Sequence, residues 1–288
     1  MLIVDAQVHI WAADRPDRPW PPGEAHRAHR PEPLSAEKLL EEMAEAGVHR
    51  AVLIPPSWEG DRNDLVLDAS RRFPDRFGAF CRVPLDETAG REELAALATA
   101  PGMLGLRFTF HKEAGLRALL NGTPDWIWPA AAEAGIPVML HAPRALHAVE
   151  KIAREHAGLR IIVDHLGLER PDQDAAAFHR LPELLRLADY RNVAVKATAL
   201  PSYSSEPYPH PGLRDPLRKV IDAFGASRVF WGSDMTRVDA PYRQIVTHFT
   251  EELPFLDAAD QAQIMGLALC NWVGWPLAHH AHLQGKTA

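Results

Sequence analysis

Apolar residues recur along the chain in short runs that alternate with longer segments of helical periodicity. The short runs are rich in the residues of buried strands, and RAVLIPP at 50–56 lacks the polar alternation of a half-exposed one. We therefore predict eight strands within residues 2–11, 50–56, 76–83, 102–108, 136–141, 159–165, 192–198 and 228–234.

The segments between these runs predict helices. The first, after Ser35, has that residue as its N-cap and Gly47 as its C-cap. The others are residues 63–73, 88–100, a stretch after 108 that is interrupted at 121–124 and resumes over 125–134, then 145–155, 175–188, 213–224, 242–253 and 257–267.

Strands that alternate with helices without a break in composition are typical of a (β/α)₈ TIM-type barrel. We expect one such domain over residues 1–277 and a frayed tail over 278–288. A doubly wound open sheet is the alternative, but it usually has a glycine-rich turn after the first strand, which this chain lacks.

Two long loops interrupt this regular pattern. Residues 12–33 are rich in proline and charge, and a loop of that length is either disordered or functional. Its histidines, His26 and His29, are interpreted as solvated. Residues 201–212 follow the seventh strand, where they could cover the mouth of the barrel.

Charge and apolar content exclude several classes of partner. The 31 basic and 38 acidic residues give a net charge of -7, which provides no basic field for nucleic acid or an anionic membrane. No apolar window has transmembrane length, and the N-terminus lacks the features of a signal peptide. Cys81 and Cys270 form no CxxC motif, so we expect reduced thiols in a cytoplasmic protein; a homo-oligomer is left open.

Polar side chains gather at the carboxyl ends of the predicted strands. Gln7 and His9 are two residues apart and share one face of the first strand. One such residue usually meets solvent, but ionisable groups at many strand ends are costly unless they are used. In a barrel these ends converge at the mouth, and the other strands contribute Arg107, His141, Asp164, His165, Lys196 and Asp234.

Four short motifs together resemble the amidohydrolase superfamily, in the branch that holds pyrone-dicarboxylate and sugar lactonases, other hydrolases and decarboxylases. DAQVHIW (5–11) resembles the family's first-strand motif, normally D-x-H-x-H. LHAP (140–143) and DHLG (164–167) resemble its fifth- and sixth-strand histidine motifs, and WGSD (231–234) its eighth-strand aspartate motif. The likeness extends from residue 3 to about residue 276.

This resemblance implies roles for individual residues. His9, His141 and Asp234 match positions that bind a divalent metal, Asp234 also matches the proton acceptor, and His165 matches the residue that activates or orients water. Gln7 departs from the pattern, because it replaces the first histidine and a carboxamide oxygen is a poorer zinc ligand than imidazole.

The departure bears on the cofactor. Arg107 stands where a lysine bridges two metals in other members, which argues against a binuclear site. The lactonase branch dispenses with metal and polarises the carbonyl with histidine and arginine. The sequence leaves open whether one divalent ion, Zn or Mn, is bound.

Several residues are candidates for substrate binding. Arg107 could clamp a carboxylate or carbonyl with its planar guanidinium, or form a structural ion pair. Arg237 is a second cation, and Lys196 points inward or reaches the rim. Trp58, Tyr203 and Tyr208 could wall a flat ring, whereas Trp231, His111, His147, His156 and His179 are interpreted as structural.

These observations favour a hydrolase that opens a lactone, or a related ester or amide, in a small carboxylated substrate. Asp234 and His165 would activate water, while His9, His141 or a metal would polarise the carbonyl. The alternative is a metal-dependent non-oxidative decarboxylase of an aromatic or muconate-type acid. A non-catalytic binding protein would be expected to lack Asp234 or His165, and both are present.

Overall fold

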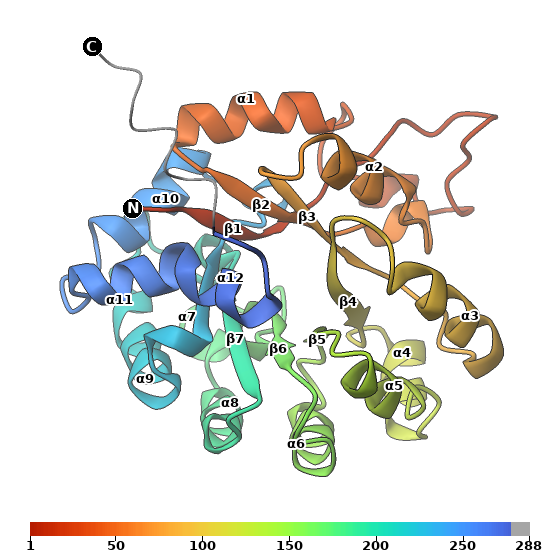
Figure 1. Ribbon diagram of the computed structural model, residues 1–288. Helices are drawn as coiled ribbons and strands as arrows, with labels where there is room; N and C mark the ends of the chain where they lie inside the picture. The colour runs from red at the N-terminus through yellow and green to blue at the C-terminus, as the bar shows by residue number, and fades with distance from the viewer. Residues whose placement is uncertain (278–288) are drawn as a thin grey trace.

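The computed structural model describes residues 1–277 and contains an eight-stranded parallel sheet whose strands follow one another in sequence order (Figure 1). β8 returns to lie beside β1, so the sheet forms a nearly closed barrel and the predicted fold class is confirmed. The strands are β1 Val4–Val8, β2 Arg50–Leu53, β3 Phe77–Cys81, β4 Met103–Thr109, β5 Val138–His141, β6 Ile161–Val163, β7 Val193–Thr198 and β8 Val229–Gly232.

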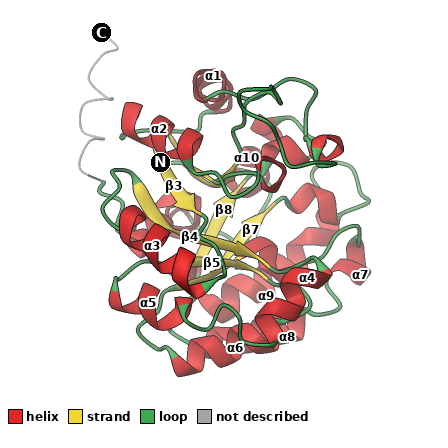
Figure 2. Cartoon of the chain, turned by 90° about the vertical axis from the view of Figure 1, so that its right-hand side faces the viewer, coloured by secondary structure: helices red, strands yellow, loops and turns green. Residues whose placement is uncertain are grey.

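Helices surround the strands, as a second view from the side shows (Figure 2). The expected caps are present on the first helix, where Ser35 accepts from the Lys38 N–H at 3.2 Å and Gly47 has φ of 78°. The helices are α1 Ala36–Ala46, α2 Asp64–Arg72, α3 Glu87–Leu97, α4 Glu113–Leu120, α5 Ile127–Glu133, α6 Leu146–Glu155, α7 Asp174–Ala177, α8 Leu181–Arg186, α9 Arg214–Phe224, α10 Tyr242–Thr250, α11 Ala258–Ala262 and α12 Ala268–Val273.

Apolar side chains form two cores, one inside the barrel and one between the strands and the outer helices. The inner core includes Val52, Phe80, Met139 and Phe230, and Leu269 of α12 packs against it. The larger outer core joins the other face of the strands to the helices. Because strands buried on both faces need no polar alternation, their apolar runs were recognisable in the sequence.

The seam between β8 and β1 is joined by the buried carboxylate of Asp5. It accepts hydrogen bonds from the backbone N–H of Gln7 at 3.0 Å and of Ser233 at 2.8 Å, and from the Tyr242 hydroxyl at 2.7 Å. β8 must approach β1 closely here, because a Cβ on Gly232 would lie 3.0 Å from the Ala6 nitrogen.

A β-bulge in β1 sets the direction of its last side chains. Asp5 pairs with Ala51 and Val8 with Leu53, so three steps on β1 match two on β2. Ala6 belongs to the inner core, and in a regular strand the next residue, Gln7, would point away from it. The extra residue turns Gln7 and His9 toward the mouth of the barrel instead.

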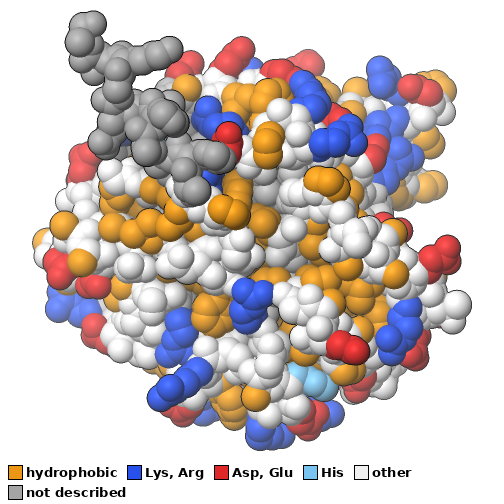
Figure 3. All heavy atoms as spheres, viewed as in Figure 1, with side chains coloured by type: hydrophobic (Ala, Val, Ile, Leu, Met, Phe, Trp, Pro, Cys, Tyr) orange, Lys and Arg blue, Asp and Glu red, His pale blue; other side chains and the backbone are white. Residues whose placement is uncertain are grey.

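The remaining surface expectations concern charge, cysteines and the tail. Basic and acidic side chains are interspersed with hydrophobic ones on the face seen in Figure 3. Within residues 1–277, no helix has the length and apolar character needed to cross a membrane. Cys81 and Cys270 are free and buried. The tail predicted at 278–288 lies outside the described residues.

Candidate active site

A cavity of about 250 Å³ opens at the carboxyl ends of the strands. Nine of the ten predicted site residues line it, and the exception is Lys196, which is fully buried beneath. Tyr208, considered as a possible wall, bonds Thr247 instead. The lining side chains are Gln7, His9, Arg27, His29, Pro56, Ser57, Trp58, Arg107, Thr109, His111, His141, His165, Glu169, Arg170, Tyr203, Asp234 and Arg237.

Asp234 directly follows Ser233 at the end of β8 and is almost completely buried. Its φ of 48° lies in the left-handed region that favours glycine, a strain of about 1–3 kcal/mol that surrounding contacts must hold. Its Oδ1 accepts no hydrogen bond from the described part of the chain. Burial raises the pKa of Asp234 to about 6, against the opposing charges of Arg237 and Arg170.

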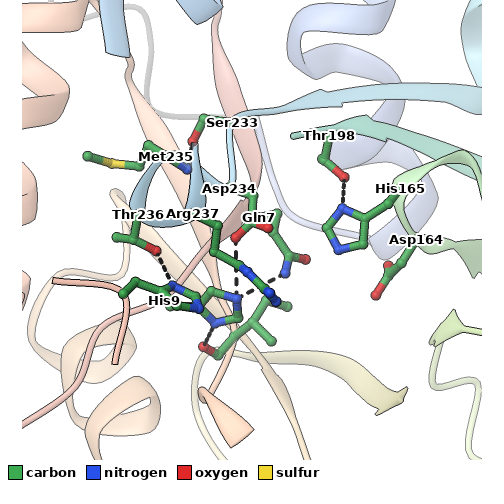
Figure 4. A network of polar contacts seen from close by, with 12 residues as sticks. Gln7, His9, Asp164, His165, Thr198, Ser233, Asp234, Met235, Thr236 and Arg237 are labelled. Atoms are coloured by element: carbon green, nitrogen blue, oxygen red, sulfur yellow. Dashed lines mark hydrogen bonds and ion pairs between the residues drawn. The ribbon is translucent and has the colours of Figure 1, made fainter. Parts of the chain in front are cut away.

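His9 faces this carboxylate through its Nε2, which lies 3.4 Å from Asp234 Oδ1 (Figure 4). The other ring nitrogen, Nδ1, lies 2.8 Å from the carbonyl oxygen of Ile54. Because a carbonyl only accepts, Nδ1 carries the proton and Nε2 is bare. Burial holds the pKa of His9 well below its usual value, so the ring is neutral.

His141 and His165 form a second pair, with ring centroids 5.1 Å apart. The Thr198 hydroxyl lies 2.7 Å from His165 Nδ1 and orients that ring. Burial lowers the pKa of both histidines well below the usual value. Two neutral imidazoles can therefore donate hydrogen bonds into the cavity without carrying charge.

Asp164 holds two cations together below the cavity. Its Oδ1 lies 2.8 Å from Lys196 Nζ, and its Oδ2 accepts from Arg107 Nε at 3.0 Å. Burial alone would raise the pKa of Asp164, but the charges of Lys196 and Arg107 hold it below its usual value. Arg107 thus forms the ion pair that was one alternative, while it also lines the cavity.

Eight lining residues were not anticipated, and five of them are ionisable. The loop 12–33 brings His29 into the cavity, where its Nδ1 lies 2.9 Å from the Thr236 hydroxyl oxygen. The centroid of its ring lies 4.2 Å from that of Trp58. His29 is therefore not the solvated loop residue that was expected, and His111, which was interpreted as structural, also lines the cavity. The unusual length of the loop 12–33 was a signal for both His29 and Arg27, whereas Glu169 and Arg170 lacked any.

The walls carry more positive than negative charge. Arg27, Arg107, Arg170 and Arg237 face the cavity, against the acidic groups of Glu169 and Asp234. Arg27 donates to the Ser57 hydroxyl at 2.8 Å, and Arg170 donates to the backbone oxygen of Arg237 at 3.1 Å. The cavity is thus electrostatically suited to an anionic ligand.

The predicted metal ligands are not assembled as a set. The part of the chain that the structure describes contains no group of three or more His, Cys, Asp or Glu side chains placed to hold a metal ion. The bare nitrogen of His9 already faces an N–H of Gln7 at 3.3 Å, and the oxygen of Gln7 accepts from the Lys196 ammonium. A donor therefore already faces the lone pair of His9 that a metal would need, and because no set of three ligands is assembled, the described residues do not fit a metal ion.

Comparisons with known proteins agree with this geometry. The family model described as amidohydrolase matches residues 4–280. L-fucono-1,5-lactonase of Burkholderia ambifaria is 31% identical over 263 residues, covering 85% of this chain and 82% of that protein. 4-Sulfomuconolactone hydrolase of Hydrogenophaga intermedia is 28% identical over 237 residues, covering 80% of this chain and 73% of that protein.

A solved structure supports the fold alone. An amidohydrolase of Burkholderia multivorans with bound zinc superposes with a TM-score of 0.79 at 18% identity, covering 96% of this chain and 100% of that one.

Proposed function

This chain belongs to the amidohydrolase family, and from that premise we propose that it is a lactonase that hydrolyses a small carboxylated lactone. The observation that carries the proposal is the buried Oδ1 of Asp234, which accepts no hydrogen bond from residues 1–277 and faces Nε2 of His9 in a cavity lined by arginines. Both curated relatives are enzymes named for lactone hydrolysis.

The first step is activation of water by Asp234. The ionised carboxylate takes a proton from water while the water oxygen attacks the lactone carbonyl carbon. His9 Nε2, at 3.4 Å, keeps a neutral ring beside this carboxyl group while it holds the proton. When the ring C–O bond breaks, that proton passes to the departing oxygen, and the product is a hydroxy acid.

The second requirement is stabilisation of the oxyanion that forms on the carbonyl oxygen. The neutral rings of His141 and His165 and the guanidinium of Arg107 are hydrogen-bond donors that line the same cavity. Their positions are fixed before the substrate arrives, since Thr198 orients His165 and Asp164 holds Arg107. Such preorganised donors stabilise developing charge more than solvent does.

The substrate carboxylate is assigned to the arginines. Arg170 and Arg237 approach the cavity from loops that follow β6 and β8, and Arg27 approaches from the long loop 12–33. Trp58 and Tyr203 supply flat apolar surface beside them. We propose that this combination selects a ring that bears at least one carboxylate.

The proposed steps use neither Zn nor Mn, because the described side chains do not fit a metal ion. The same observation weighs against the metal-dependent decarboxylase. The two reactions are distinguished by their products, since a decarboxylase releases CO₂ and a lactonase opens a ring without losing carbon. A cytoplasmic location is part of the proposal and rests on the two free, buried cysteines.

A panel of lactones tests the proposal. Five- and six-membered lactones with and without a carboxylate are incubated with the wild-type chain, and acid release and CO₂ are measured. Ring opening that favours the carboxylated members is the expected result. CO₂ release without ring opening would overturn it.

A further inference from the structure

A chain of three polar side chains runs from the interior of the barrel to the catalytic pair. Lys196 Nζ donates to Gln7 Oε1, Gln7 Nε2 lies 3.3 Å from His9 Nε2, and His9 Nδ1 lies 2.8 Å from the Ile54 oxygen. Lys196 and Gln7 have no measurable exposure, so no water competes for these contacts.

The hydrogen bonds that link these three side chains can run in one direction only, from Lys196 through Gln7 to His9. An ammonium group has no acceptor, so it must contact the oxygen of the Gln7 carboxamide. That contact directs the NH₂ group of Gln7 toward His9. The Ile54 carbonyl forces the proton of His9 onto Nδ1, which leaves Nε2 to accept from Gln7.

Lys196 is itself held from the opposite side. Its nitrogen lies 2.8 Å from Asp164 Oδ1 and 3.2 Å from the Met139 sulfur. Asp164 also bonds Arg107, so the position of the ammonium is fixed by a buried ion pair rather than by a flexible stem.

We propose that Lys196 is a positioning residue for the reaction: acting through Gln7, it holds the ring of His9 in the place where Nε2 faces Asp234. The inference rests on the proposed function. It assigns Gln7 the role of an orienting donor, because its amide oxygen accepts from Lys196 and its amide NH₂ group faces His9.

The substitution Gln7→Glu isolates the donor. The carboxylate keeps the size of the side chain and an acceptor for Lys196, so the protein should fold, but it has no N–H for His9. We expect kcat to fall about 10- to 100-fold with little change in KM, as for loss of one buried hydrogen bond that acts on the reacting groups. Unchanged kcat would overturn the inference.

A double-mutant cycle separates positioning from support of the fold. If Lys196 acts through Gln7, Lys196→Met added to Gln7→Leu should cost no further kcat, whereas independent structural roles would multiply the losses. Lys151→Met, on the exposed face of α6, is the control for the lysine-to-methionine change and should keep wild-type kcat.

A readout independent of turnover keeps the inference separate from the proposed function. Nitrogen-15 NMR of labelled histidine, with His9 assigned by its absence in His9→Gln, reports whether Nε2 accepts a hydrogen bond. The Nε2 signal should move in both Gln7→Glu and Lys196→Met. A moved signal in a protein that opens no lactone supports the positioning and rejects the reaction. An unmoved signal rejects the positioning, whatever the activity.

Discussion

Oδ1 of Asp234 and Nε2 of His9 lie 3.4 Å apart, and neither atom carries a proton when the carboxyl is ionised and the ring is neutral. Burial disfavours the charged carboxylate, and Oδ1 accepts no hydrogen bond from the described residues that would stabilise it. Asp234 is therefore a base whose pKa is closer to neutrality than that of an exposed aspartate.

The pH dependence of catalysis follows from this pair. Asp234 must be ionised to take a proton from water, and its pKa is raised to about 6. We expect kcat/KM of the free enzyme to rise with pH and level off above about pH 7. Initial rates from pH 4 to 9 measure the profile. An acid limb centred near pH 4 would show that the base is an unperturbed carboxylate.

The same shift predicts an effect on stability. The pKa of about 6 in the folded protein exceeds the ordinary aspartate value of 3.8, so the contribution of Asp234 to stability is fully present below about pH 4 and is lost as pH rises through 6. Asp234→Asn should therefore be more stable than the wild type at pH 8, by up to about 3 kcal/mol, and gain little at pH 4. Urea unfolding at the two pH values measures this. A stability loss at pH 8 would contradict it.

Arg107 is predicted to bind substrate with geometry that lysine cannot reproduce. Arg107→Lys keeps the positive charge but lacks the planar fork. The fall in kcat/KM should therefore correspond to a loss of about 2–4 kcal/mol of transition-state stabilisation. Steady-state kinetics measure the loss, and a thermal melt controls for the buried ion pair with Asp164. If only the melting temperature fell, Arg107 would serve the fold alone.

Metal removal should leave the reaction intact. Because a hydrogen-bond donor already faces the lone pair of His9, any bound ion should be single, weakly held and lost to a mild chelator. Elemental analysis before and after dialysis, together with rates of ring opening, checks both points. Two tightly bound metal equivalents per chain would contradict the expected site.

The sequence was sufficient to predict the barrel, because strands buried on both faces leave uninterrupted apolar runs at regular intervals. It also predicted that His9, His141, His165 and Asp234 would meet, since barrel strands end at a common mouth, and all four line one cavity. The bulge in β1 could not be predicted from the sequence, because the extra residue is defined by the pairing of β1 with β2.

The parts of the cavity that were missed depend on long-range contacts. His29 reaches the site through Thr236, which is 207 residues away in the chain. Lys196 was expected to meet substrate, yet its partners Asp164 and Gln7 hold it below the cavity. These contacts join residues that are far apart in the sequence, so local spacing along the chain does not predict them.

Asp234→Asn tests the central claim most directly. The change removes the base while keeping the size of the side chain, so the fold should survive in circular dichroism. With a carboxylated lactone at pH 8, kcat should fall by about 10²–10⁴ relative to the wild type. Equal rates of ring opening by the two proteins would mean that Asp234 is not the base.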